Sequence, residues 1–530
     1  MKTRTLISGA VAVTAAGAIT VAGTLVAQAQ ETGSAALGEA IETILADNRI
    51  VDSQAGVLVR DAATGEVLYD HNGNQRAIPA SNNKIATAAA ALEILGEDHT
   101  FTTDVLGDRP VDGVVSGDLY LRGSGDASML QADYDQLAAD LAAAGVSTVD
   151  GDLVADDTAF DHERHGEEWA WGDLQYSYGA EISALTVGSG TEHLGGTVRI
   201  YVDPGAAEGE DLQITTVPET DYFTIVNEAT TGAPGSGDEI SILRDEHANT
   251  VRITGTLGTD ADQTYGTRAV INPTGLVADV FADALADNGI DLTGDIRLGE
   301  TAPQGGETLA SHASAPLSEL ATELLKRSNN SYAESFFKAV GAATADQGTF
   351  TTGQEAVYAT LAEYGVDTEP IRQVDGSGSS RFDETTPETL TDLFIAAKGA
   401  SWADTWYDAL PIACESDPMV GGTLASRMCG TPAAGNVHAK TGTITSVSAL
   451  SGYVTDADGR DLVFSIMLND HLADSVKDVE DQIAAAIAGH SENATADEIA
   501  TFGNVEELAE TGTTVPGDRE CTWYEPVPAC

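Results

Sequence analysis

The chain has 530 residues, which is too long for one ordinary domain and predicts two to four. It carries 84 Asp and Glu residues against 25 Lys and Arg, a formal net charge of −59. Phosphate contacts need clustered cations, so we expect no nucleic-acid partner, and binding to an anionic membrane surface is disfavoured. The acidic residues are spread along the whole chain. We therefore expect an acidic surface suited to a saline habitat, with simple solubility as the alternative explanation.

The first 29 residues have the pattern of a signal peptide. Lys2 and Arg4 precede an apolar run from Leu6 to Val26, and Ala27-Gln28-Ala29 has the small-x-small form of a cleavage site. We expect a secreted, extracellular chain that begins near Gln30 and has no membrane span. An uncleaved anchor is the alternative, because the apolar run is long.

All four cysteines lie late in the chain, and an exported protein can keep disulfides. The simplest of three connectivities joins Cys414 to Cys429 and Cys521 to Cys530. No Cys-x-x-Cys cluster indicates a metal, and His162-Glu-Arg-His165 falls short of a metal motif. We expect no metal ion and no cofactor.

The most informative stretch begins at Ser81. It follows two short predicted strands, Ala55–Arg60 and Val67–Tyr69, and leads into an alanine-rich run that predicts a helix ending near Gly96. Residues three apart share a helix face, so the Ser81 hydroxyl and the Lys84 amine should lie side by side. This pairs a nucleophile with a base, provided that burial or a second cation favours the neutral amine. A helix cap followed by a surface lysine is the alternative interpretation.

The sequence pattern changes in the middle of the chain. Strands ended by acidic turns follow residue 101, and residues 190–266 alternate short β-like runs with Gly and Pro turns, which predicts a small β domain. A helix is expected from Ala278 to Asn288. Between these parts lies an aromatic cluster that suits either core packing or a pocket wall. Its members are Trp169, Trp171, Tyr176 and Tyr178, with Asp173 among them.

Two further polar motifs lie in the last part of the chain. Ser328-Asn-Asn330 separates two predicted helices, and polar groups at such a junction need hydrogen-bond partners. Lys440-Thr441-Gly442-Thr443 lies on a predicted strand, where one cation and two hydroxyls suit a substrate carboxylate. A capped helix break and an ordinary strand are the alternatives for each motif taken alone.

Taken together and in this order, the three motifs resemble the set of penicillin-binding proteins and serine β-lactamases. The sequence between Ser81 and Ser328 is longer than one transpeptidase-like domain needs, which indicates an insertion. Three further segments match: Gly117–Asp126, Asp375-Gly-Ser-Gly-x-Ser-Arg381 and Gly422-Thr-Leu-x-x-Arg427. The chain is most similar to the D-alanyl-D-alanine carboxypeptidase/endopeptidase family of class C low-molecular-mass penicillin-binding proteins, the penicillin-binding protein 4 type, in its actinobacterial branch.

The resemblance implies an α+β fold. A transpeptidase/serine β-lactamase-like domain, an antiparallel sheet flanked by helices, would occupy residues 30–101 and 288–490. A second domain, 102–189 and 267–287, would be inserted into it, and the small β domain, 190–266, would be nested in the second. The signal peptide, 1–29, and an acidic C-terminal tail, 491–530, with its possible disulfide, lie outside the resemblance.

The resemblance also implies a reaction on peptidoglycan stem peptides that end in D-Ala-D-Ala, at the cell wall. Ser81 would attack the carbonyl between the two D-alanines, and Lys84 would act as the base. Ser328 would pass a proton to the leaving amine, and Asn330 would hold Lys84 and the substrate amide. Lys440 would keep Lys84 neutral by its charge.

Substrate binding is assigned by the same resemblance. Lys440 with Thr441 and Thr443, around Gly442, would bind the terminal carboxylate, and the N–H groups of Ser81 and Thr443 would form an oxyanion hole. The side chain of the stem peptide would meet four residues, listed in chain order: Trp171, Asp173, Tyr178 and Arg381. Ser379 departs from the pattern, since the family usually has an apolar residue there.

β-Lactams would acylate Ser81 and inhibit the enzyme. Two alternatives stay open: a β-lactamase or esterase that uses the same serine, and a non-catalytic wall-binding or sensing protein. The large insertion argues against the first, because β-lactamases have none. The intact Ser81, Lys84 and Lys440 argue against the second.

Overall fold

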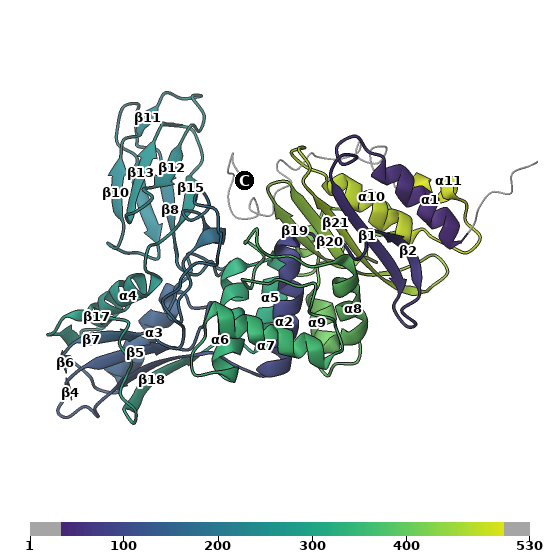
Figure 1. Ribbon diagram of the computed structural model, residues 1–530. Coiled ribbons are helices and arrows are strands. Elements are labelled where there is room, and N and C mark those ends of the chain that lie inside the picture. The colour runs from purple at the N-terminus through teal and green to yellow at the C-terminus, as the bar shows by residue number, and fades with distance from the viewer. Residues whose placement is uncertain (1–32, 503–530) are drawn as a thin grey trace, which may run out of the picture.

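A five-stranded antiparallel sheet joins the two ends of the chain in the computed structural model, which describes residues 33–502. The strand order is β19-β20-β21-β1-β2, so strands from near the N-terminus pair with strands from near residue 470 (Figure 1). The strands are β1 (Gln54–Asp61), β2 (Val67–His71), β19 (His438–Ile444), β20 (Val447–Thr455) and β21 (Asp461–Asn469). β20 and β21 are buried along almost their whole length, because helices cover both faces of the sheet.

Alternate residues of the sheet belong to different cores. Leu450 and Phe464 pack with helices α1 (Ser34–Leu45), α10 (Lys477–Ala488) and α11 (Ala496–Phe502), which cover one face (Figure 1). Ala449 and Val463 pack with the helices of the other face. Those helices are α2 (Asn83–Ile94), α5 (Leu317–Arg327), α6 (Asn330–Thr344), α7 (Phe350–Glu363), α8 (Pro387–Ala397) and α9 (Ala403–Ala409).

The predicted helix after Ser81 is confirmed as α2, and it is the centre of the helical layer. Every residue from Asn83 to Leu92 is buried, because α2 contacts α5, α6 and α7. A helix buried on all sides needs no polar face, and its alanines permit close approach of its neighbours. The first turn of α2 is thereby fixed inside the protein.

A second body holds one mixed sheet and one smaller parallel sheet with two helices, α3 (Gln131–Ala143) and α4 (Pro273–Asp287). The larger sheet has the order β17-β7-β5-β3-β18 and the smaller one β16-β6-β4. Their strands are β3 (Thr102–Gly107), β4 (Val114–Ser116), β5 (Leu119–Gly123), β6 (Thr148–Asp150), β7 (Leu153–Asp156), β16 (Asp291–Leu292), β17 (Ile296–Leu298) and β18 (Glu307–Ala313).

Short strands make up a third body, which stands beside the second (Figure 1). They form two three-stranded sheets, β10-β13-β12 and β15-β8-β9, and the pair β11-β14. The strands are β8 (Thr197–Asp203), β9 (Gln213–Val217), β10 (Thr224–Asn227), β11 (Thr230–Gly232), β12 (Ser241–Arg244), β13 (Thr250–Thr254), β14 (Thr256–Gly258) and β15 (Thr264–Ala269).

The predicted α+β fold class is confirmed, but two of the expected domain limits are wrong. The chain does not return to the first domain at residue 288, because β16, β17 and β18 still pair with β6, β7 and β3. The tail does not begin at residue 491 either. Ala496 and Ile499 are buried, and α11 packs against α1 and α10. The other domain limits stay predictions.

Several expectations concern the ends of the chain. The signal peptide and the pair Cys521/Cys530 lie outside the described residues. Between residues 33 and 502, no helix combines the length and the apolar character that crossing a membrane requires.

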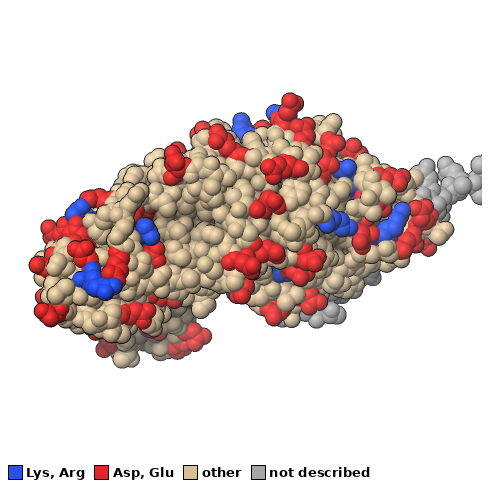
Figure 2. Space-filling model, turned by 90° about the horizontal axis from the view of Figure 1, so that it is seen from below, with Lys and Arg blue, Asp and Glu red and all other residues tan. Residues whose placement is uncertain are grey.

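Acidic side chains are scattered over the face seen in Figure 2 and far outnumber the basic ones. With a net charge of −59, like charges repel one another across such a surface. Salt screens this repulsion, so it should strengthen the folded state.

We expect the thermal midpoint to rise as NaCl goes from about 0.1 M to about 1 M, where the Debye length falls from about 10 Å to about 3 Å. Circular dichroism melts in NaCl would measure it, with an uncharged osmolyte at matched osmolality as control. A midpoint that falls steadily as NaCl is added would contradict the prediction.

Candidate active site

Ser81 and Lys84 meet at the buried start of α2. Ser81 lies in a short 3-10 turn, Ala80–Asn82, that leads into the helix. Lys84 Nζ donates to Ser81 Oγ and to the Ser377 carbonyl oxygen, each at 2.8 Å. The lysine is 0% exposed and Ser81 only 9%. A buried amine in contact with a hydroxyl is the arrangement that activates a serine nucleophile.

A second lysine–serine pair lies close by. Ser328 ends α5 in the left-handed conformation, with a φ of 56°, which turns the chain sharply into α6. Lys440 Nζ, from β19, donates to Ser328 Oγ at 2.8 Å and to the Thr441 carbonyl oxygen at 2.7 Å. Lys440 is also fully buried. Each of the two hydroxyls therefore has its own lysine.

Both serines border one cavity of about 160 Å³. Asn330 and Thr443 border it too, so the structure brings residues of all three motifs together. Thr443 Oγ1 is shielded from solvent and has no hydrogen-bond partner within residues 33–502. An unpaired buried hydroxyl is costly, and a substrate oxygen at this place would satisfy it.

The remaining residues of the third motif support the cavity from behind. A Cβ placed on Gly442 would lie 2.6 Å from the Pro79 carbonyl oxygen and 3.1 Å from Ser81 N. Only glycine therefore lets β19 lie against the turn of Ser81. The Thr441 hydroxyl donates to Thr423 Oγ1 at 2.8 Å.

A tight loop, Asp375–Ser380, closes over Lys84. Its Gly378 has a φ of +83°, and a Cβ there would lie 1.9 Å from the Ala80 carbonyl oxygen. The Asp375 carboxylate accepts from Ser380 N at 2.8 Å and from Gly378 N. Glu334, on α6, accepts from Gly376 N at 2.9 Å and from Ser377 N at 2.8 Å. Burial, with the nearby Asp375 charge, raises the pKa of Glu334 to about 8.

The Asn330 amide is held by Tyr178 and by Ser379. Its Nδ2 donates to the Tyr178 carbonyl oxygen at 2.8 Å and to Ser379 Oγ at 3.1 Å. These partners come from the second body and from the Asp375–Ser380 loop. The role expected for Asn330 at Lys84 stays a prediction.

Three of the four residues predicted to meet the side chain of the stem peptide line the cavity: Asp173, Tyr178 and Arg381. The Tyr178 hydroxyl donates to Asp173 Oδ1 at 3.3 Å. Burial raises the pKa of Asp173, against the opposing effects of the Tyr178 hydroxyl and the Arg381 charge.

The prediction of Trp171 as a pocket residue is wrong. Its side chain is 73% exposed and lies edge-on to His247. Trp169 lines the cavity instead, and its Nε1 donates to Asp375 Oδ2 at 2.9 Å. The two tryptophans are two residues apart in a loop, where no regular periodicity indicates which one faces inward.

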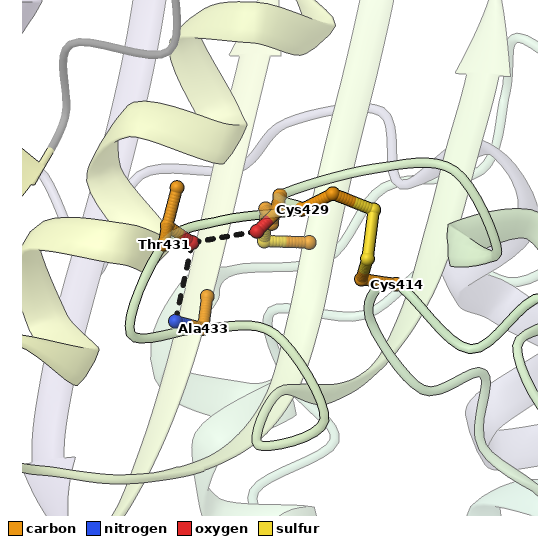
Figure 3. Close-up of a disulfide and its surroundings, with 5 residues drawn as sticks. Cys414, Cys429, Thr431 and Ala433 are labelled. Atoms are coloured by element: carbon orange, nitrogen blue, oxygen red, sulfur yellow. Dashed lines mark hydrogen bonds between the residues drawn. A yellow bond between two sulfur atoms is a disulfide. The ribbon is translucent and has the colours of Figure 1, made fainter. Parts of the chain in front are cut away.

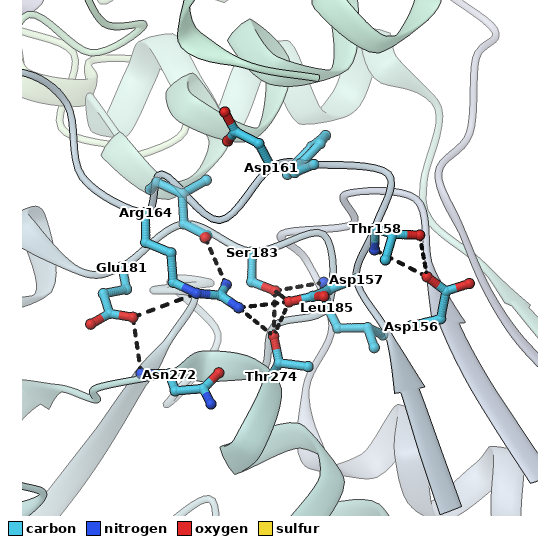
Figure 4. A network of polar contacts seen from close by, with 12 residues as sticks. Asp156, Asp157, Thr158, Asp161, Arg164, Glu181, Ser183, Leu185, Asn272 and Thr274 are labelled. Carbon is cyan, nitrogen blue, oxygen red and sulfur yellow. Dashed lines mark hydrogen bonds and ion pairs between the residues drawn. The ribbon is translucent and has the colours of Figure 1, made fainter. Parts of the chain in front are cut away.

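Polar contacts hold in place the segment that carries Trp169, Asp173 and Tyr178 (Figure 4). Asp157 Oδ2, 2% exposed, accepts from Arg164 Nη2 at 2.7 Å and from Ser183 Oγ at 3.3 Å. The Thr274 hydroxyl of α4 donates to the same oxygen, and Arg164 Nη1 donates to the Ile182 carbonyl oxygen at 3.0 Å. Hydrogen bonds thus hold this segment near both of its ends to the second body.

The disulfide Cys414–Cys429, one of the two predicted pairs, is present in the segment that precedes β19 (Figure 3). It closes a loop that contains Thr423, the partner of Thr441. Just after Cys429, the Thr431 hydroxyl donates to the Met428 carbonyl oxygen at 2.7 Å and accepts from Ala433 N at 3.2 Å. The chain therefore turns firmly before it enters β19.

Sequence reasoning missed the roles of Trp169, Glu334 and Ser379. A signal existed for Glu334, because a lone carboxylate in the apolar run Tyr332–Val340 lies one helical turn after Asn330. Within the described residues, no three His, Cys, Asp or Glu side chains converge as metal ligands would.

Comparison with known proteins identifies the relatives of this chain. A model of the D-Ala-D-Ala carboxypeptidase 3 (S13) family matches residues 37–489. A D-alanyl-D-alanine carboxypeptidase of Actinomadura sp. is 45% identical over 459 residues, which cover 86% of this chain and 85% of the relative. The D-alanyl-D-alanine carboxypeptidase DacB of Haemophilus influenzae is 27% identical over 425 residues, which cover 79% and 85%.

Solved structures show the same fold. Penicillin-binding protein 4 (DacB) from Haemophilus influenzae superimposes with a TM-score of 0.72 and 24% identity, over 88% of this chain and 99% of that chain. The same protein in complex with a β-lactam gives a TM-score of 0.67 and 23% identity, over 89% and 99%.

Gly378→Ala should disrupt the site, since the new methyl group would collide with the Ala80 carbonyl oxygen beside Ser81. A displacement of about 1 Å at reacting groups can reduce a rate about 100-fold, and we expect a loss of this size in the acylation of Ser81 by a fluorescent penicillin. Gly459→Ala is the matched control: its φ is also +83°, but nothing lies within 4 Å. Equal acylation rates in the two variants would contradict the steric argument.

The double variant Cys414→Ser/Cys429→Ser should lower the free energy of unfolding, because the disulfide restricts the unfolded chain. For the sequence separation of 15 residues, the expected loss is about 3 kcal/mol. Urea titration followed by fluorescence would measure it, and the unmutated protein under a reducing agent should shift similarly. An unchanged midpoint in both would refute the prediction.

Proposed function

This chain belongs to the D-Ala-D-Ala carboxypeptidase 3 (S13) family, and from that premise we propose that Ser81 is its nucleophile. The chain is a serine-type D-Ala-D-Ala carboxypeptidase, a hydrolase that acts on peptidoglycan stem peptides through an acyl-enzyme. The observation that carries the assignment of Ser81 is the 2.8 Å hydrogen bond from the buried Lys84 amine to its hydroxyl.

In the acylation step, Ser81 Oγ attacks the carbonyl carbon of the penultimate D-alanine. The neutral Lys84 amine takes the hydroxyl proton as the new C–O bond forms. The backbone N–H groups of Ser81 and Thr443 stabilise the negative oxygen of the tetrahedral intermediate. The close approach of β19 to Ser81 N supports this pairing of donors.

The peptide bond then breaks, and the leaving D-alanine nitrogen needs a proton. Ser328 provides it and is resupplied from Lys84, while Lys440 orients Ser328 through its 2.8 Å hydrogen bond. Asn330 assists by contacting Lys84 and the substrate amide. Water next attacks the Ser81 ester, and Lys84 takes a proton from this water. Lys84 then gives the proton to Ser81 Oγ as the ester C–O bond breaks, which releases the shortened peptide and restores the serine and the neutral amine.

Recognition of the terminal carboxylate falls to Lys440 and Thr443. The unpaired, buried hydroxyl of Thr443 supports a direct contact, whereas Thr441 and Gly442 hold β19 in place behind it. Asp173, Tyr178 and Arg381, with Trp169 in place of Trp171, receive the free end of the stem-peptide side chain. The opposite charges of Asp173 and Arg381 suit a group that carries both an amine and a carboxylate.

Three finer points belong to the same proposal. The enzyme also cleaves D-Ala-linked cross-links as a DD-endopeptidase, and β-lactams acylate Ser81 and leave slowly. Residues 1–29 direct secretion, so the enzyme works outside the cell at the wall. The resemblance in sequence and the export pattern Ala27-Gln28-Ala29 support these points.

Covalent labelling by a fluorescent penicillin tests the assignment. We expect the unmutated protein to be labelled and to release D-alanine from a D-Ala-D-Ala peptide, and Ser81→Ala to lose both, because alanine has no hydroxyl to form the ester. Ser335→Ala is the control, since Ser335 is buried in α6 but does not border the cavity. Labelling of Ser81→Ala would refute the assignment, and rapid nitrocefin turnover without D-alanine release would favour a β-lactamase.

A further inference from the structure

The Asn330 amide has one orientation that its neighbours allow. The Tyr178 carbonyl oxygen lies 2.8 Å from Nδ2, and a carbonyl can only accept a hydrogen bond. The amide atom that faces it must therefore be the nitrogen. Ser379 Oγ lies 3.1 Å from the same nitrogen. An amide nitrogen has two hydrogens, and these two acceptors use both.

The direction of the Ser379 hydroxyl follows from this. Because Asn330 Nδ2 has no lone pair to accept with, Ser379 Oγ must accept from it. The Ser379 proton is then free for Ser377 Oγ, which lies 2.8 Å away and also accepts from Ser379 N at 3.3 Å. Ser377 is 0% exposed, so water does not compete for the Ser377 hydroxyl.

Ser377 connects Lys84 with Asn330. Its carbonyl oxygen accepts from Lys84, and its hydroxyl holds Ser379, which holds Asn330. Its own N–H is bound by Glu334, four residues after Asn330 on the same helix. Asn330 and the anchor of its partner are thus fixed to one rigid element.

We propose that Ser379 is a positioning residue that holds the Asn330 amide in this orientation, so that its carbonyl oxygen, Oδ1, is presented to the reacting groups. Asn330 then acts as an acceptor, for an N–H of Lys84 or of the substrate peptide. The inference rests on the proposed function, because it concerns how the same site performs its acylation step.

Four proteins test the proposal: Ser379→Ala, Ser379→Thr, Asn330→Ala and the double variant Asn330→Ala/Ser379→Ala. The measured quantities are the rate of Ser81 acylation by a fluorescent penicillin and kcat and KM for D-alanine release. Losing one positioning hydrogen bond should lower the acylation rate and kcat about five- to tenfold in Ser379→Ala, with KM changed less than about twofold. Threonine keeps the hydroxyl, so Ser379→Thr should recover to within about twofold.

The double variant tests whether the effect of Ser379 on the rate depends on Asn330. If Ser379 acts through Asn330, removing it from the Asn330→Ala background should cost nothing more. The proposal is overturned by an unchanged acylation rate in Ser379→Ala, by a rise in KM alone, or by losses that multiply in the double variant. Equal losses in Ser379→Ala and Ser379→Thr would overturn it too.

Failure of the proposed function gives a different result. In that case the unmutated protein itself would neither be labelled at Ser81 nor release D-alanine. A labelled, active protein whose rate is indifferent to Ser379 refutes the positioning role alone. Thermal midpoints of all four proteins show that any loss of rate is not a loss of fold.

Discussion

The burial of Lys84 is the constraint on which the rest of the structure depends. Removing an amine from water is costly unless oxygen atoms replace the lost hydration, and these must come from elements that are themselves rigid. The Ser81 hydroxyl and the Ser377 carbonyl fill that need at 2.8 Å each. One lies three residues earlier, in the 3-10 turn that leads into α2, and the other comes from a loop almost 300 residues later in the chain. The fold has to hold these two segments together for the contact between Lys84 and Ser81 to form.

Glycines and buried carboxylates make that close approach possible. Gly378 and Gly442 press loop and strand against the turn of Ser81 where any Cβ would collide with backbone oxygens. Glu334 and Asp375 bind the loop's N–H groups, so its carbonyl at Ser377 is directed at Lys84. The second body adds the remaining wall, since Tyr178 binds Asn330 and Trp169 binds Asp375. The insertion therefore completes the cavity as well as lengthening the chain.

The sequence predicted the parts of this arrangement that depend on motif and periodicity. Ser81 with Lys84, Ser328 with Asn330, and the strand of Lys440 were expected at one site, and all contribute to one buried cluster around the cavity. It could not predict which loop tryptophan faces inward, because irregular backbone has no period to read. Nor could it predict the return of the chain after residue 288. β16 and β17 are short, and the pairing of β16, β17 and β18 with β6, β7 and β3 depends on tertiary contacts.

The net charge of the chain acts over longer distances than the contacts within the site. Repulsion among exposed carboxylates extends over a Debye length and responds to salt, whereas the contacts of Lys84 and Lys440 are short and fully buried. Screening ions cannot enter between Lys84 and Ser81 at 2.8 Å. The stability of the fold and the geometry of the site are thus subject to separate forces. A chain with few cations can become strongly acidic without altering the contacts of Ser81 and Ser328, provided that the lysines beside these two serines are kept.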